Sequence, residues 1–203
     1  MDSLSATHNL VDNPAFQQIT MTKKELLLKP QLLEETLYIA GGCLWGVQEF
    51  FKYIPGVLKT EAGRANGTTN STKTPYDGYA ECVKTSFDIN SVSVEELIYY
   101  LLEIIDPFSI NQQGNDIGKK YRTGIYSSNQ NHLIKVKNCI KQIEETLNAK
   151  NKTFKTIAIE VLPITNFVPS DTKHQDRLTS HPEDYSYCHI PLNVLHKYKN
   201  SDS

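Results

Sequence analysis

The sequence has little net charge and no long apolar run. Its 21 lysines and arginines stand against 23 aspartates and glutamates, for a formal net charge of −2. Such a chain has no electrostatic means of holding nucleic acid or an anionic membrane. No apolar run approaches the ~20 residues of a membrane span, and the start, MDSLSATH, lacks the basic and apolar parts of a secretory signal. We therefore expect a cytoplasmic monomer that binds neither nucleic acid nor membrane.

Cysteine is scarce and widely spaced. The four cysteines are Cys43, Cys82, Cys139 and Cys188, and no two of them form a C-x-x-C pair. This spacing argues against a zinc site and against the disulfide framework of a small secreted protein. A few separate thiols fit a reducing compartment. We expect no bound metal or other cofactor.

The length of 203 residues fits one domain with tails. Residues 1 to about 22 are polar and have no clear period. Leucines between residues 23 and 35 surround Pro30, which predicts a short helix broken at the proline. We expect residues 1–35 to form an N-terminal tail and short helix, and residues 36–203 to form a single catalytic domain.

Apolar periodicity predicts the order of strands and helices. Strands are expected over residues 36–39, 57–64, 79–87, 123–126 and 156–162, and helices over 47–54, 94–105, 129–147 and, capped by Ser170, 174–178. Ser93 and Glu96 have the spacing of a capping box. The first six elements follow the order β-α-β-β-α-β of a ferredoxin-like fold. The sequence thus predicts an α+β, two-layer α/β sandwich with an extra helix and strand and a long irregular C-terminal segment.

One cysteine lies where a predicted strand turns into a helix. Residues 40–46 read AGGCLWG, and the two glycines permit a tight turn before Cys43. The positive end of a helix dipole stabilises a thiolate there, and the thiolate is the nucleophilic form. Trp45 can form the wall of a pocket beside the sulfur. Position alone leaves two interpretations open, a nucleophile or a buried structural cysteine.

Several blocks together resemble the methionine sulfoxide reductase A family. GGCLWG at residues 41–46 is similar to the family's Gly-Cys-Phe-Trp-Gly, and GYAE at 78–81 to its Gly-His-Ala-Glu. NQQGNDIGKKYRTGIY at 111–126 looks like the family's long Asn-Gln-Gln-Gly-Asn-Asp block, and HQD at 174–176 and YC at 187–188 follow in order. The resemblance covers roughly residues 36–190. It implies a two-layer α/β fold and the reduction of methionine S-sulfoxide, free or in proteins, as repair of oxidative damage.

The resemblance also implies roles for three residues. Cys43 would attack the sulfoxide and become a sulfenic acid, and Glu81 would be the acid near the sulfoxide oxygen. Cys188 would resolve the sulfenic acid to an intramolecular disulfide, which thioredoxin then reduces. Strand alternation turns Glu81 and Cys82 to opposite faces of the sheet. Burial among apolar neighbours would raise the pKa of Glu81, as an acid requires, although alone this residue would be interpreted as a solvated strand position.

The resemblance implies that an apolar wall and a long loop over residues 109–121 bind the substrate. The expected binding residues are Leu44, Trp45, Asp116 and Tyr121, with His174 and Asp176 as supporting hydrogen-bond partners, or Asp176 as a helix cap. The chain departs from the family at Leu44, where a phenylalanine is usual, and at Tyr79, where a histidine is usual. It also has Arg64 in place of a substrate-binding tyrosine. We expect Arg64 or Tyr76 to supply the missing hydrogen-bond donor.

Alternatives remain for the resolving thiol and for the function. Cys139 lies beside an apolar helical stripe, Cys82 points away from Glu81, and Cys188 could also be a free thiol on a loose tail. A thiol peroxidase or thiol–disulfide oxidoreductase is the second function, although a thioredoxin-like protein would be expected to carry C-x-x-C. A non-catalytic binder of oxidised methionine is the third. It would need Trp45 and a pocket but not two cysteines and an acid together, so the reductase is favoured.

Overall fold

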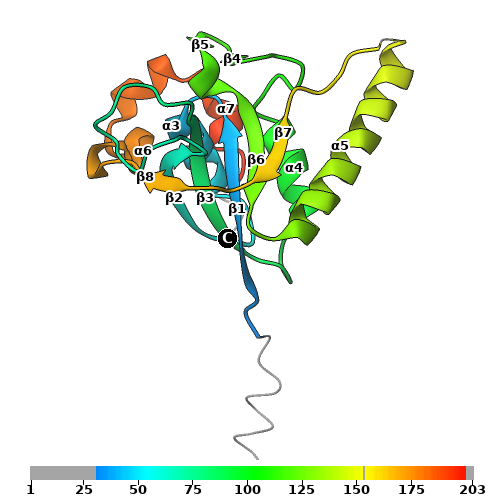
Figure 1. Cartoon of the computed structure of the whole chain (residues 1–203), viewed down its shortest axis with the longest axis horizontal. Helices are drawn as coiled ribbons and strands as arrows, with labels where there is room; N and C mark the ends of the chain where they lie inside the picture. Colours follow the sequence, from blue (N-terminus) through cyan, green and yellow to red (C-terminus); the bar gives the residue numbers. More distant parts are fainter. Residues whose placement is uncertain (1–30, 153, 200–203) are drawn as a thin grey trace, which may run out of the picture. The chain divides into compact units, whose positions relative to one another are not determined.

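A computed structural model describes residues 31–152 and 154–199. Its centre is a six-stranded sheet in the order β7-β6-β1-β3-β2-β8 (Figure 1). The strands are β1 (Glu34–Gly41), β2 (Val57–Ala65), β3 (Ala80–Asp88), β6 (Thr123–Ser127), β7 (Glu160–Pro163) and β8 (Phe167–Pro169). The helices are α3 (Leu44–Phe51), α4 (Val94–Leu102), α5 (Gln130–Asn151), α6 (Arg177–Ser180) and α7 (Leu192–Leu195). None of the helices in these ranges is long and apolar enough to cross a membrane.

The inner four strands form the predicted ferredoxin-like core. Strands β6, β1, β3 and β2 are neighbours in that order and pair antiparallel throughout. Helix α3 connects β1 to β2, and α4 leads from β3 towards β6. Strand β7 adds parallel to β6 at one edge, and β8 adds antiparallel to β2 at the other. The α+β prediction, with an extra helix and an extra strand, is confirmed.

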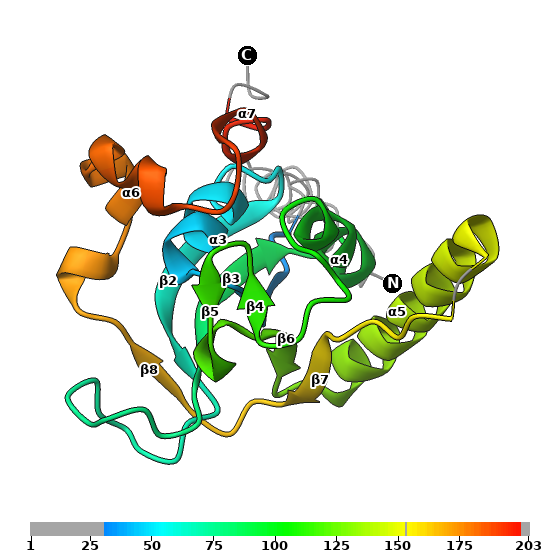
Figure 2. The same cartoon turned by 90° about the horizontal axis from the view of Figure 1, so that it is seen from above.

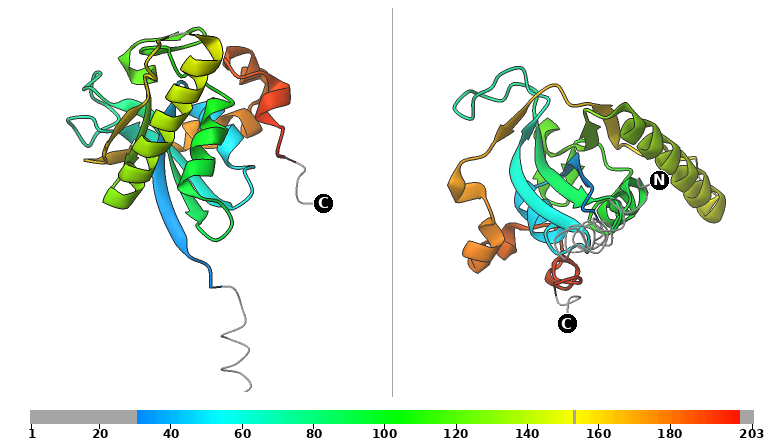
Figure 3. Two further views of the ribbon diagram at one scale, coloured as in Figure 1. Left: turned by 90° about the vertical axis from the view of Figure 1, so that its right-hand side faces the viewer. Right: turned by 90° about the horizontal axis from the view of Figure 1, so that it is seen from below.

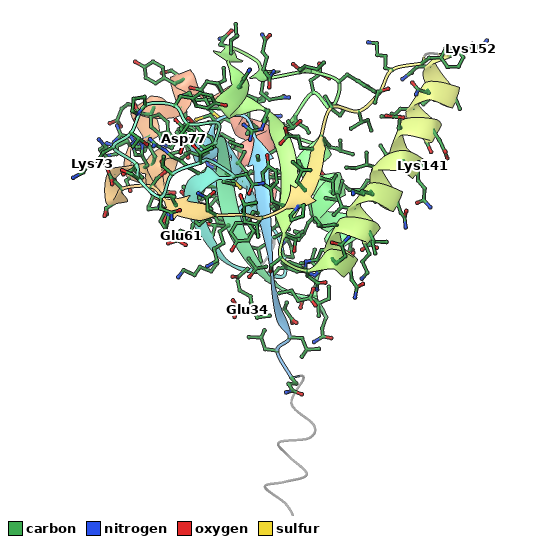
Figure 4. All side chains as sticks on the ribbon, viewed as in Figure 1. Glu34, Glu61, Lys73, Asp77, Lys141 and Lys152 are labelled. Carbon is green, nitrogen blue, oxygen red and sulfur yellow. The ribbon has the colours of Figure 1, made fainter. Side chains whose placement is uncertain are left out.

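The sheet has two different faces. Leu37, Val83 and Phe87 pack with residues of α3, α4 and α5 in the main core. Figure 2 shows α3 and α4 alongside the strands, while the far end of α5 extends away from them. Lys141 on α5 projects outward in Figure 4. The opposite face carries a small cluster that includes Cys82, so the predicted alternation along β3 is confirmed.

Helix α4 begins as the sequence predicts. The Ser93 side chain accepts a hydrogen bond from the backbone N–H of Glu96, and the Glu96 carboxylate accepts one from the backbone N–H of Ser93. This capping box satisfies two N–H groups that the first turn cannot pair internally. Helix α5 begins after Asn129, whose side chain accepts from the N–H of Asn131.

The structure contains short elements that the sequence does not predict. The loop over residues 109–121 contains a hairpin of β4 (Gln112–Gln113) and β5 (Asp116–Ile117), followed by the turn η1 (Lys119–Tyr121). Strands of two residues leave no alternation to detect, and Gly114, with φ +56°, makes the turn between them. Strand β8 has only three residues, and the sequence does not predict it either.

The chain's two end regions also differ from expectation. Ser170 caps no helix, because the turn η2 (Thr172–His174) follows Asp171 and α6 follows Asp176. The irregular C-terminal segment contains the turn η3 (Pro182–Tyr187) as well as α7 (red in Figure 3). Glu34 and Glu35 belong to β1 and not to the expected helix. Residues 31–33 are in neither a helix nor a strand, and residues 1–30 of the predicted tail lie outside the described residues.

Candidate active site

Cys43 is at the N-cap of α3, and only Gly42 separates it from the end of β1. Its backbone is extended, with φ −64° and ψ 125°, and its carbonyl accepts the first hydrogen bond of the helix from the N–H of Val47 at 3.3 Å. Gly42 before it has φ +90°, where an L-side chain is strained. A Cβ there would also meet Gln113 at 2.8 Å. The predicted strand–turn–helix placement of Cys43 is confirmed.

The thiol of Cys43 is not ionised by this position alone. Burial raises the pKa of Cys43, the negative charge of Glu81 raises it further, and a hydrogen bond from the backbone N–H of Trp45 lowers it less. The dipole of α3 favours the thiolate, as expected, but burial and the charge of Glu81 oppose it, so the thiol form is favoured in the site without substrate. The thiolate must form when a partner accepts its proton.

Glu81 meets the start of the same helix. One carboxylate oxygen accepts a hydrogen bond from the backbone N–H of Leu44 at 3.2 Å, and the other lies 3.0 Å from the ammonium of Lys120. The Glu81 side chain is only 13% exposed. Burial raises the pKa of Glu81, and the Lys120 charge opposes this without cancelling it. A buried carboxyl with a raised pKa is suited to donate a proton.

Cys43 and Glu81 open into one cavity of about 510 Å³. The lining residues are Cys43, Leu44, Trp45, Arg64, Tyr79, Glu81, Asp116, Lys120, Tyr121, Ser170, His174, Arg177, Asp184 and Tyr187. Most predicted site residues are among them. Tyr76, Asp176 and Cys188 do not line this cavity.

Trp45 is held in place by the C-terminal segment. Its indole N–H donates to Nδ1 of His174 at 3.2 Å, and the guanidinium of Arg177 lies 5.4 Å from the centre of its ring. Arg177 is in turn paired with Asp184 at 2.6 Å. Burial and the nearby charge of Lys173 lower the pKa of His174, in keeping with a neutral ring that accepts the indole proton. The indole therefore presents a fixed apolar surface to the cavity.

Of the two candidates for the missing donor, Arg64 lines the cavity and Tyr76 does not. Arg64 donates to the carbonyl of Thr72 at 3.1 Å and lies 4.5 Å from the centre of the Tyr79 ring. Tyr76 packs on Tyr79 from outside, with ring centres 5.1 Å apart, and is 46% exposed. Of the two candidates, Arg64, stacked on Tyr79, is therefore the one whose side chain lies in the cavity wall.

Asp176 lies outside the cavity. It is the residue before α6, but its side chain makes no capping hydrogen bond and instead accepts from Lys52 at 3.3 Å. Its backbone N–H donates to the buried Gln48 at 2.8 Å. Gln48 also donates to the side chain of Gln175 at 3.1 Å, and Gln175 bonds to both backbone groups of Ala62. Asp176 and its neighbours therefore tie the C-terminal segment to α3 and β2.

Cys188 approaches α3 one turn beyond Cys43. A Cβ built on Gly46 would lie 2.7 Å from the sulfur of Cys188, so the absence of a side chain at Gly46 makes room for this thiol. Burial raises the pKa of Cys188 to about 11. Cys82 and Cys139 are both buried, and Cys82 is fully buried on the opposite face of the sheet.

A family model described as peptide methionine sulfoxide reductase matches residues 35–202. This chain belongs to that family. Among solved structures it is similar to methionine sulfoxide reductase A of Corynebacterium diphtheriae, with 30% identity over 73% of this chain and 76% of that one and a TM-score of 0.67. It is also similar to reduced Mxr1 of Saccharomyces cerevisiae, with 25% identity, coverage of 81% and 94%, and a TM-score of 0.68.

The chain is accordingly a peptide methionine sulfoxide reductase, and the family, fold and enzyme class expected from the sequence are confirmed. Within residues 31–152 and 154–199, no group of three or more His, Cys, Asp or Glu side chains is placed to hold a metal ion.

The sequence does not predict Lys120, Arg177 and Asp184, which line the cavity of the reductase, or His189, which lies beside it. Lys120 precedes an expected substrate residue, and this adjacency was the only signal for it. Arg177 and Asp184 belong to the segment interpreted as irregular, and only the fold brings their ion pair to Trp45. His189 follows Cys188 and packs against the turn before Cys43, a contact between residues distant in the sequence.

Proposed function

We propose that the reductase acts on the S epimer of methionine sulfoxide, free or in proteins, with Cys43 as nucleophile and Glu81 as acid. The observation that carries this proposal is that both side chains open into one cavity. The Glu81 carboxylate also accepts from the N–H next to Cys43, at 3.2 Å. A sulfoxide bound there would have a thiol on one side and a proton donor on the other.

The burial of both groups supports a coupled proton transfer. The charge of Glu81 raises the pKa of Cys43, so the two groups disfavour being ionised together. Glu81 donates its proton to the sulfoxide oxygen as that oxygen becomes a better acceptor, and the resulting carboxylate takes the proton of Cys43. The thiolate attacks the substrate sulfur, and the oxygen passes to Cys43. The products are methionine and Cys43 sulfenic acid, with no proton gained or lost overall.

The walls of the cavity fit a methyl sulfoxide. Leu44 and the fixed indole of Trp45 supply apolar surface for the methyl group. Tyr121, Arg64 and Tyr79 carry donors that can reach the polar end of the substrate. We assign Asp116 to binding as well. His174 and Asp176 act as supports, one through Trp45 and the other through Lys52 and Gln48.

Cys188 completes the cycle in this proposal. A sulfenic acid condenses with a neighbouring thiol to give a disulfide and water. Cys188 packs on the helix turn next to Cys43, whereas Cys82 and Cys139 are buried away from it. Thioredoxin would then reduce the Cys43–Cys188 bond. We also propose that the enzyme is a monomer and works in a reducing cytoplasm.

Single-turnover reduction of separated epimers tests the proposal. Reduced enzyme without added reductant should convert one equivalent of a peptide containing the S sulfoxide to methionine and leave the R sulfoxide unchanged. Cys43→Ser should form no methionine, while Cys139→Ser should match the wild type as a control for loss of a buried thiol. Equal turnover of both epimers, or methionine formation by Cys43→Ser, would refute it.

A further inference from the structure

Two buried polar atoms beside the active site face each other without a hydrogen bond. Oδ2 of Asp116 and Nδ1 of His189 are 3.4 Å apart, and their side chains are 19% and 7% exposed. Neither atom has a hydrogen-bond partner among the described residues. Buried polar atoms are nearly always paired, so an unpaired couple at a reactive site calls for a functional explanation.

The other ring nitrogen of His189 fixes where its proton lies. Nε2 is 3.1 Å from the backbone carbonyl of Ile104, which can only accept, so Nε2 carries the proton. Nδ1 faces the Asp116 carboxylate, and in a neutral ring it would present a lone pair to that carboxylate. A proton held between these two atoms, which are 3.4 Å apart, would join them in a charge-assisted hydrogen bond.

The pair lies close to the turn that precedes Cys43 and to the segment that carries Cys188. His189 follows Cys188 directly in the chain. Its ring lies against Gly42, next to Cys43, where a Cβ would be 2.9 Å from Cε1. Asp116 lines the cavity that contains Cys43. The pair therefore lies between the nucleophile's turn and the segment that carries the second thiol.

The charge of Asp116 acts on four titratable groups around it. It contributes to raising the pKa of Cys43, Glu81, Tyr121 and Cys188. A proton taken up between Asp116 and His189 would neutralise the pair. The penalty that Asp116 imposes on a Cys188 thiolate would fall at the same moment.

We propose that the Asp116–His189 pair accepts the proton of Cys188 when this thiol attacks the sulfenic acid of Cys43. The S–H bond of Cys188 breaks, and its proton moves to Nδ1 of His189. The sulfur–sulfur bond forms as the S–O bond of Cys43 breaks, and the leaving hydroxide takes a proton from Glu81 and departs as water. The Cys188 sulfur is oxidised and the Cys43 sulfur is reduced by the same two electrons. This inference rests on the proposed function.

The test separates the two chemical steps in His189→Gln. Reduced enzyme is mixed with one equivalent of sulfoxide between pH 6 and 10, and methionine and the Cys43–Cys188 disulfide are each quantified over time. We expect methionine formation within about twofold of the wild type and disulfide formation slower by roughly 10²-fold or more, the usual contribution of a base. Ser186→Ala, an exposed position on the same segment, should leave both rates unchanged.

The pH dependence distinguishes a proton acceptor from a merely structural residue. In His189→Gln the disulfide rate should rise about tenfold per pH unit towards the Cys188 pKa of about 11, because only the thiolate fraction reacts. In the wild type it should level off well below that pH. Added imidazole should restore the disulfide rate of His189→Gly by occupying the space between Gly42 and Gly114. This rescue tests the proton acceptor even if the glutamine variant is poorly folded.

Three results would overturn the inference. They are an unchanged pH dependence in His189→Gln, a parallel loss of methionine formation and disulfide formation, and a failure of imidazole to accelerate His189→Gly. If the wild type forms no methionine in its first turnover, the proposed function itself fails. If it forms methionine and the pH profiles coincide, only the assignment of the proton acceptor fails.

Discussion

Adding one methyl group at Gly46 should separate reduction from recycling. In Gly46→Ala the new Cβ would lie 2.7 Å from the sulfur of Cys188 and 2.9 Å from Cδ1 of Ile190. Carbon–carbon contacts are comfortable at roughly 3.5–4.0 Å. The segment that carries Cys188 and Ile190 must therefore retreat from α3 by roughly 1 Å.

This retreat should slow the formation of the disulfide. Overpacking of this kind costs about 1–3 kcal/mol. Since 1.4 kcal/mol is a factor of ten, closure of the Cys43–Cys188 bond should slow by roughly 5- to 150-fold. Alanine within a helix is more favourable than glycine by about 1 kcal/mol, so the variant should still fold. Formation of the first methionine should change little, because Gly46 does not line the cavity.

The assay is a rapid-quench single turnover that counts methionine and free thiols in parallel. Gly46→Ala should release one methionine at the wild-type rate and lose its second thiol slowly. Combining Gly46→Ala with Ile190→Ala should restore part of the closure rate, because one of the two close contacts is removed. An unaltered closure rate in Gly46→Ala would refute the assignment of Cys188 as the thiol that approaches across this glycine.

Three further substitutions test the cavity. Glu81→Gln keeps the shape and removes the acid, and the single-turnover rate should fall by roughly 10²–10⁴-fold; a much smaller loss would assign the proton to another group. Trp45→Ala should raise the substrate concentration at half-maximal rate, and unaltered binding would leave this indole with a packing role only. Lys120→Gln removes the cation that lowers the pKa of Glu81, so that pKa rises further, the acid stays protonated to higher pH, and the pH at which the rate declines should move upward. A pH–rate profile that stays in place or moves downward would contradict the Lys120–Glu81 coupling.

Local signals in the sequence were sufficient for the fold and for the place of Cys43 at the start of a helix. The capping box at Ser93 and Glu96 and the alternation along β3 are properties of short stretches, and both are confirmed. Cys43 could be placed at the start of α3 because a strand, two glycines and a helical pattern follow one another. These features depend on neighbours in the chain, which periodicity records.

The remaining features depend on contacts between distant residues. The raised pKa of Cys43 results from its burial in the assembled site and from the charge of Glu81, whereas the sequence indicated only the helix end. The C-terminal segment has no periodicity, yet His174 and Arg177 from it fix Trp45. Strand β8 and the β4–β5 hairpin are too short for any periodic pattern.

The most direct measurement is peptide mapping of the enzyme after one turnover. Fully reduced protein would receive one equivalent of the S sulfoxide peptide without reductant. Its free thiols would then be blocked, the protein digested, and the cysteine-containing peptides identified by mass spectrometry. Our account predicts one methionine per chain and a Cys43–Cys188 disulfide, with Cys82 recovered as a free thiol. In Cys188→Ser it predicts the same methionine yield with Cys43 trapped as a sulfenic acid. Unmodified Cys43 after methionine release, or a bond between Cys43 and Cys82, would contradict it.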